Sequence, residues 1–166
     1  MDHRPITLPL TPSDLAAFIA AHHIAAEIVP VAAETPTVPA AAAALGVTTG
    51  QIIKSLLFLV RDQPLLVIAS GETLVDRGIL AARYGVGKKQ VKLADAQTVL
   101  RLTGYPAGGV PPFGHLTPLP TLLDRDVAAW DVVYGGGGDD HTLLRIAPAE
   151  LARAAGAEWV ALWKET

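Results

Sequence analysis

The sequence predicts a mixed α/β fold, in which one domain over residues 1–166 carries helices on a mixed, mostly antiparallel sheet. The chain has 166 residues, enough for one domain with a sizeable core. Hydrophobic residues make up 51% and charged residues 17%, a composition too apolar for a disordered chain. Short apolar runs alternate with segments of helical spacing, and tight turns join some of the runs, which favours a mixed sheet over a strict β-α-β repeat.

Helices are predicted where a capping residue precedes a segment with apolar residues at helical spacing. Thr11 and Pro12 begin the first helix, which ends near His22, while Asp76 and Asp95 cap two later helices. A glycine after the last turn marks the end of most of them, because glycine readily adopts the left-handed cap conformation. The helices after the first one are predicted at 39–45, 77–84, 96–103 and 148–155, followed by Gly46, Gly85, Gly104 and Gly156.

Strands are predicted for short apolar runs that lie between turns. The run 52–60 ends in a turn at 61–64 and returns as 65–69, which is typical of a hairpin. A glycine-rich turn at 135–140 separates two further runs in the same way. The remaining predicted strands are 25–33, 91–93, 119–123, 132–134 and 142–146, and 159–163 is a last strand or helical turn.

Composition excludes several classes of function. Cysteine is absent, which rules out disulfides, cysteine-ligated zinc, iron–sulfur clusters and a cysteine nucleophile. A net charge of −3 disfavours a sequence-independent binder of duplex DNA. Apolar runs such as 56–60 are too short to span a membrane, and the first ten residues do not resemble a signal peptide. We therefore expect a cytoplasmic protein with no cofactor and no membrane or DNA partner.

Lys54 is the most unusual residue, because it lies inside the apolar run 52–60, directly before Ser55. A lysine in a buried strand is costly unless its ammonium finds an anion or water. One interpretation is that the ammonium holds an anionic ligand. The other interpretation is that Lys54 stands at the start of the strand and faces solvent, with the stem of its side chain lying on the sheet.

A second unusual segment is the loop 108–114, which contains Gly108, Gly109, Val110, Pro111 and Pro112. Glycines let a ligand approach the backbone N–H groups, and prolines stiffen the second half of the loop. Such a loop can present donors to a carbonyl or phosphate oxygen, although it matches neither the Walker nor the Rossmann pattern. A rigid surface turn is the alternative.

A third segment joins a run of glycines to Asp139, Asp140 and His141, which invites a metal interpretation. No second histidine stands at helical ligand spacing, and neighbouring strand residues point to opposite faces. We therefore expect a flexible turn with solvated carboxylates and no metal. A Ser-His-Asp triad is also unsupported, because none of the three serines lies in a nucleophile-elbow context.

Four segments in order carry a family resemblance. They are 35–37 before an alanine-rich helix that ends at 45–47, the strand 51–58 with Lys54, the tripeptide 103–105, and the loop 108–114. Together they resemble the YbaK/ProX family of aminoacyl-tRNA deacylases, whose domain is also inserted in bacterial prolyl-tRNA synthetases as an editing module. The resemblance covers about 34–151.

The resemblance implies a compact mixed α/β fold that hydrolyses a wrongly attached amino acid from tRNA without a metal or a side-chain nucleophile. In it Lys54 anchors the terminal adenosine and its phosphate, and the Gly-x-x-x-Pro loop 108–112 cradles the ester. A ribose hydroxyl of the substrate, or the thiol of a cysteine, assists the reaction. The expected catalytic positions are Lys54 and Gly108. The expected substrate-binding residues are Lys54, Ser55, Gly108, Gly109, Val110, Pro111, Pro112, Gly138 and His141.

Three hypotheses are consistent with these features. The first is a hydrolase that edits in trans, removing cysteine or alanine from tRNA-Pro, with the tRNA 3′ CCA end as partner and prolyl-tRNA synthetase as a second candidate partner. The second is a non-catalytic module that binds aminoacyl-tRNA or a synthetase. The third is a metal hydrolase that uses Asp139, Asp140 and His141. Family members often carry a Ser-Ala-Gly-like segment where this chain has 136–138, which leaves the amino acid open.

Overall fold

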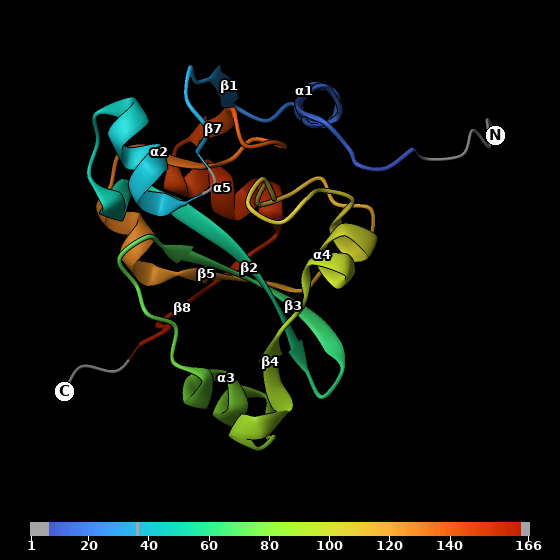
Figure 1. The fold of residues 1–166 in the computed structure, drawn as a ribbon. Helices are drawn as coiled ribbons and strands as arrows, with labels where there is room; N and C mark the ends of the chain where they lie inside the picture. The colour runs from blue at the N-terminus through green and yellow to red at the C-terminus, as the bar shows by residue number, and fades with distance from the viewer. Residues whose placement is uncertain (1–6, 36, 164–166) are drawn as a thin grey trace.

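The protein is described by a computed structural model that covers residues 7–35 and 37–163 (Figure 1). The middle residue of the predicted turn at 35–37 lies outside these residues. In chain order the elements are α1 (Pro12–Ala21), β1 (Ala26–Pro30), α2 (Val38–Leu45), η1 (Thr49–Gln51), β2 (Ile53–Val60), β3 (Gln63–Ser70), α3 (Arg77–Tyr84), η2 (Lys88–Gln90), β4 (Val91–Leu93), α4 (Ala96–Thr103), β5 (Thr121–Asp124), η3 (Arg125–Ala129), β6 (Val133–Gly136), β7 (Thr142–Ile146), α5 (Pro148–Ala155) and β8 (Glu158–Val160).

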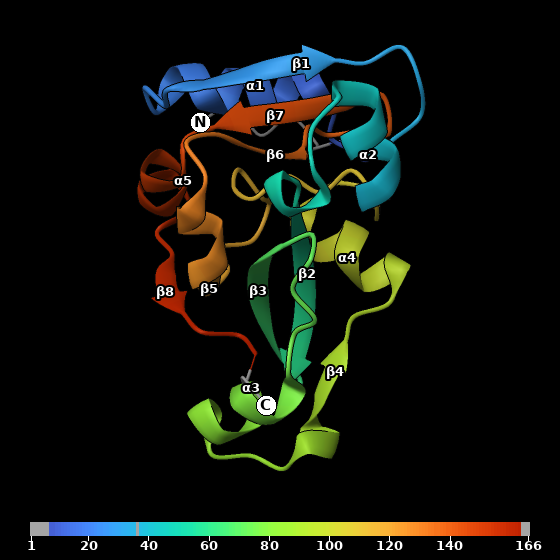
Figure 2. The ribbon, with the colours of Figure 1, turned by 90° about the vertical axis from the view of Figure 1, so that its left-hand side faces the viewer.

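The strands form two sheets, where the sequence predicted one. Three strands pair in the order β1-β7-β6, and five pair in the order β4-β2-β3-β5-β8. Four of the pairs are antiparallel, and only β3–β5 and β5–β8 are parallel, which confirms the mixed, mostly antiparallel arrangement. A single parallel bridge between Ile52 and Tyr134 joins the two sheets. In Figure 2 β1 and β7 lie across the top, and β2 and β3 run down from them.

The helices begin and end where the sequence predicted. The side chains of Asp76 and Asp95 accept hydrogen bonds from backbone N–H groups in the first turns of α3 and α4. The four predicted glycines all adopt left-handed cap conformations after α2, α3, α4 and α5. These caps satisfy backbone groups that a helix end would otherwise leave unpaired.

Several strand boundaries differ from the prediction. β1 is shorter than 25–33, and β8 ends at Val160, before the predicted end at 163. The predicted turn at 135–140 also starts too early, because Gly135 and Gly136 belong to β6 and pair with Leu144 and Leu143. Glycines are tolerated there because the strand passes close to other backbone, a long-range contact that local sequence does not encode.

The five-stranded sheet is buried on both faces, which explains why β3 is almost continuously apolar. Leu66 and Ile68 of β3 pack on one face, in a cluster that also contains Leu144 of β7. Leu65 and Val67 point to the other face and pack with Leu80 of α3. This packing holds β2 at a fixed position between β3 and the three-stranded sheet.

Candidate functional site

A small cavity of about 200 Å³ lies where the two sheets separate. β2 pairs with β3 along its whole length but with β4 only through Phe58–Val60. Directly before β2, Ile52 forms a bridge to Tyr134 of β6. The free edge of β2 at 53–56 therefore faces β6 across the cavity. The lining residues are Thr35, Thr37, Val38, Ala41, Ile52, Ile53, Lys54, Ser55, Leu56, Gly108, Val110, Gly135, Gly136 and Leu143.

The cavity brings together part of the residue set that the sequence predicted. Lys54 and Ser55 form one wall, and Gly108 and Val110 form another. Sequence reasoning missed the contribution of the segment 35–41, which enters through the cap and first turns of α2. The predicted residues that are not among the cavity lining are Gly109, Pro111, Pro112, Gly138 and His141.

Lys54 is partly buried and lies on the same face of the sheet as its register partner Ala69. Burial lowers the pKa of the Lys54 ammonium, and the nearby charge of Asp124 partly opposes this effect. Asp124 is fully buried, and its carboxylate accepts hydrogen bonds from the backbone N–H groups of Ser70 and Asp126, each at 3.0 Å. Among residues 7–35 and 37–163 no carboxylate forms an ion pair with Lys54, so its ammonium is available to an anionic ligand.

Ser55 places a hydroxyl at the same wall. Its Oγ is buried and has no hydrogen-bond partner in the described part of the chain. Leaving a buried hydroxyl unpaired costs about 1–3 kcal/mol, so such a group is suited to a ligand that pairs with it. Lys54 and Ser55 point to opposite faces of β2, yet both reach the cavity because it lies at the strand edge.

The loop that contains Gly108 and Gly109 is held against the turn after β6. Gly108 has a φ of +90°, a conformation that favours glycine. The N–H of Gly138 donates to the carbonyl of Gly109 at 2.9 Å, and a Cβ at Gly109 would lie 3.0 Å from the backbone of Asp139. The N–H of Gly109 itself donates to the carbonyl of Pro106 at 3.0 Å. This donor is therefore used within the loop, and the role of Gly109 in substrate binding stays a prediction.

Gly136 fixes the position of the same loop from the side of β6. A Cβ at Gly136 would lie 2.2 Å from the carbonyl oxygen of Val110, which no side chain can accommodate without a shift of the backbone. The close approach of these two backbones gives the cavity its narrow wall. Only the three-dimensional structure reveals this requirement, since 136 and 110 are far apart in the sequence.

The proline half of the loop is anchored by His115 and Phe113. The Nε2 of His115 lies 2.7 Å from the carbonyl oxygen of Pro111. Because a carbonyl only accepts, Nε2 carries the proton. Burial lowers the pKa of His115, which the bond to Pro111 partly opposes, so the ring favours its neutral form. Phe113 is buried, and its ring stacks on Phe18 with centroids 5.9 Å apart, which anchors the loop to the core.

We expect His115→Ala to lower kcat/KM for the deacylation that the sequence resemblance implies several-fold and to lower Tm by about 2–4 °C, since one hydrogen bond of about 1 kcal/mol is lost. His115→Gln should restore both values in large part, because its amide N–H can donate at a similar reach. Thermal melts and steady-state kinetics of the two variants check this. Wild-type kinetics in His115→Ala would show that the Pro111 bond does not position the loop.

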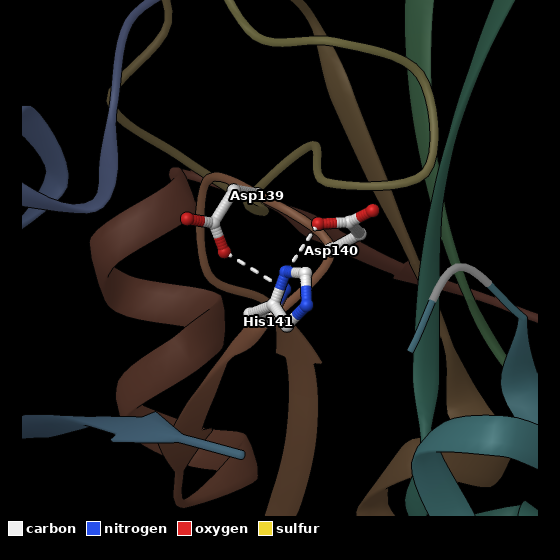
Figure 3. A group of neighbouring side chains, drawn as sticks. All are labelled: Asp139, Asp140 and His141. Carbon is white, nitrogen blue, oxygen red and sulfur yellow. Dashed lines mark hydrogen bonds and ion pairs between the residues drawn. The ribbon is translucent and has the colours of Figure 1, made fainter. Parts of the chain in front are cut away.

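Asp139, Asp140 and His141 lie together in the turn before β7 (Figure 3). The residues stand in a turn, as the sequence predicted, and their ligand atoms are all within 4.8 Å of one another because the alternation of neighbouring strand residues does not apply in a turn. The Nδ1 of His141 lies 2.6 Å from Asp140 Oδ1, and its backbone N–H donates to Asp139 Oδ1 at 2.9 Å.

The backbone of this turn supports the cavity, while its side chains face outward. The carbonyl of Asp140 accepts hydrogen bonds from the N–H of Thr35 at 2.5 Å and from the hydroxyl of Thr35 at 3.0 Å. Thr35 lines the cavity, whereas the side chain of His141 is half exposed and is not among the cavity lining. The turn therefore holds one wall of the cavity in place.

The geometry defines a domain with a small cavity between the strand that carries Lys54 and the loop that contains Gly108. The chain belongs to the aminoacyl-tRNA editing domain family, whose model matches residues 32–154. This confirms the resemblance that the sequence motifs carry. None of the described helices is long and apolar enough to cross a membrane.

Three relatives place the chain within this family. It is 30% identical over 117 residues to the uncharacterized protein YwhH of Bacillus subtilis strain 168, covering 70% of this chain and 73% of that one. It is 23% identical over 103 residues to the proline–tRNA ligase of Thermoanaerobacter sp. strain X514, of which the match spans 18%. A crystal structure of a candidate trans-editing enzyme for prolyl tRNA synthetase superposes with a TM-score of 0.85 and 33% identity, covering 96% of this chain and 100% of the other.

Proposed function

We propose that this protein is a hydrolase that acts in trans on aminoacyl-tRNA and removes a wrongly attached small amino acid, cysteine or alanine, from tRNA-Pro. One observation carries the proposal. The partly buried Lys54, the unpaired hydroxyl of Ser55 and the loop at Gly108 and Val110 wall the same small cavity. The family and the solved trans-editing relative support the editing role.

The size of the cavity favours a small amino acid. Its volume of about 200 Å³ is below the range of about 300–1,000 Å³ that is usual for ligand pockets. The aminoacyl group enters it, and the adenosine that carries the ester stays at its mouth. The walls include small residues such as Ala41, Gly135 and Gly136, which favours a short side chain. Size alone discriminates weakly, at about 1–3 kcal/mol per methylene, so cysteine and alanine are both substrates to test.

The reaction needs positioning more than a strong catalytic group, because an ester is already activated. The oxygen of a water molecule, which the neighbouring ribose hydroxyl orients, adds to the ester carbonyl carbon. The bond to the ribose oxygen then breaks, and that oxygen takes up a proton. Lys54 holds the terminal phosphate, and the loop at Gly108 supplies backbone dipoles to the oxygen that gains charge. A cysteine substrate can use its own thiol as the attacking group.

A panel of mischarged tRNAs tests the proposal. Purified protein is incubated with Cys-, Ala- and Pro-tRNA-Pro, and release of each amino acid is followed over time. We expect release of cysteine or alanine well above the spontaneous rate and little release of proline. Tight binding of the same tRNAs without release would support the non-catalytic module instead.

Removal of metal ions separates the proposal from the metal-hydrolase alternative. We expect deacylation to survive exhaustive treatment with EDTA, because Lys54 and the loop at Gly108 need no metal to act as proposed. The same rate before and after chelation, measured on one preparation, is the expected result. Loss of activity with EDTA and its return with Zn²⁺ would revive the site at Asp139, Asp140 and His141, whose ligand atoms are close enough to share an ion.

A further inference from the structure

A second hollow of about 970 Å³ adjoins the cavity, and the proposed chemistry does not use it. We call it the indole groove, and the residues that define it here are Glu72, Leu74, Arg77, Asp126, Trp130 and Trp163. The short helix η1 separates the two hollows, since Gly50 lines the groove and Ile52 lines the cavity. Gly71 stands between Ser70 and Glu72, which line the groove, and a Cβ at Gly71 would lie 2.5 Å from Val38 of the cavity wall.

Two indoles form the apolar part of the groove. Trp163 is 39% exposed, and its Nε1 donates to Asp126 Oδ2 at 2.6 Å, which fixes the ring. Trp130 is partly exposed and approaches Gly50, where a Cβ would lie 2.8 Å from the indole. Leu74 is 86% exposed at the same site. Fixed, partly exposed aromatic rings provide stacking surfaces for nucleic acid bases.

The polar groups of the groove match the rest of a nucleotide. Arg77 and Lys88 are exposed cations that can pair with phosphates. Glu72 and Asp126 are carboxylates, and a carboxylate accepts hydrogen bonds from the exocyclic amino group of cytosine. In the described ranges no ion pair joins these cations to these carboxylates. Glu72 Oε1 accepts from the Thr49 hydroxyl at 2.8 Å and Asp126 Oδ2 accepts from Trp163, so each carboxylate has its other oxygen for an amino donor of a ligand, while the two cations can pair with its phosphates.

We propose that the indole groove binds the two cytidines that precede the terminal adenosine of tRNA. The inference rests on the proposed function, which places the ester in the small cavity. The nucleotides of the 3′ end must then lie outside that cavity, and the groove beside it is at the upper end of the usual size range for ligand pockets. Stacking on the indoles supplies affinity, and the carboxylates favour cytosine over uracil, which lacks the amino donor.

The direct test is binding of the labelled trinucleotides CCA and UUA, followed by fluorescence polarisation. Wild-type protein should bind CCA more tightly than UUA. Trp163→Leu and Trp130→Leu should each weaken binding of CCA about tenfold or more, as is usual for the loss of a base–aromatic stack. Trp159→Leu is the matched control, because Trp159 of β8 is partly buried but is not among the residues that line the groove. Thermal melts show that each variant is folded.

This binding test does not require turnover, so it separates the groove from the proposed function. If CCA binding depends on Trp163 but the protein releases no amino acid, the result would support the cytidine site and contradict the proposed hydrolase function. Equal binding of CCA and UUA that is insensitive to both tryptophan changes would overturn the groove. A third outcome would also overturn the groove as a cytidine site. The tryptophan variants would keep CCA binding but lose binding of prolyl-tRNA synthetase, and the groove would then be a protein interface.

Kinetics provide a second readout if the hydrolase is active. Trp163→Leu should raise KM for mischarged tRNA about tenfold, with a smaller change in kcat. An aminoacyl-adenosine lacks the two cytidines. On this substrate the ratio of the variant's KM to the wild-type KM should therefore approach one. An equal loss on both substrates would contradict the proposal, because the groove would then act through the fold.

Discussion

Replacement of Lys54 by alanine is expected to lower kcat/KM for deacylation at least about tenfold, or about 1.4 kcal/mol of transition-state stabilisation. The ammonium lies at the cavity wall without an ion-pair partner in the described part of the chain, so its charge is available to the terminal phosphate. The fold should persist, because removal of a partly buried charge relieves desolvation. Lys92→Ala is the matched control, since it removes an equal charge from an exposed position on β4.

The pH dependence of the wild type gives a second check on Lys54. Burial lowers its pKa below the ordinary lysine value of 10.5. The charged form is the one that holds a phosphate, so activity should be present below the lowered pKa and should fall as pH rises through it. After correction for spontaneous ester hydrolysis, KM is expected to rise at a lower pH than for a fully solvated lysine. A folded Lys54→Ala protein with wild-type activity would remove Lys54 from the site.

Gly108→Val is expected to cut turnover about 10²–10³-fold, the usual cost of losing one oxyanion donor. The φ of +90° at Gly108 is unfavourable for a branched side chain, so the substitution forces the loop into another conformation. The backbone around Gly108 would then move away from the ester. Single-turnover deacylation and thermal melting of the same preparation measure the two consequences separately.

Gly85→Ala is the matched control for backbone strain. Gly85 also has a positive φ, +64°, it caps α3, and a Cβ added there would meet nothing within 4 Å. The substitution should cost about 1–2 kcal/mol of stability and leave deacylation unchanged in the folded protein. If Gly108→Val loses activity only in proportion to its folded fraction, as a merely structural loop would, the catalytic role of Gly108 is wrong.

Local sequence features predicted most of the secondary structure because the determinants are themselves local. Asp76 and Asp95 cap helices through their own side chains, and Gly156 ends α5 by adopting the left-handed cap conformation. The hairpin of β2 and β3 arises from an apolar run that reverses at one turn. Strand boundaries were less predictable, since β6 continues through Gly135 and Gly136 only because it pairs with β7.

The candidate site was predictable only in part, because the cavity arises between two sheets. Lys54 and Gly108 were found from a charge in an apolar run and from a glycine–proline pattern. The separation of β2 from β6 after the Ile52–Tyr134 bridge has no local signature, so the contribution of 35–41 was missed. The bond from the Gly109 N–H to the Pro106 carbonyl is, by contrast, a local turn contact between residues three apart.

The most direct measurement of the proposed activity is the rate at which the protein releases the amino acid from Ala-tRNA-Pro and Cys-tRNA-Pro in a single turnover, with protein in excess. We expect at least one of these two esters to be hydrolysed much faster than without protein, and the acceleration to fall at least about tenfold in Lys54→Ala. Saturating binding of both tRNAs with release at the spontaneous rate would contradict the assignment of this protein as a deacylase.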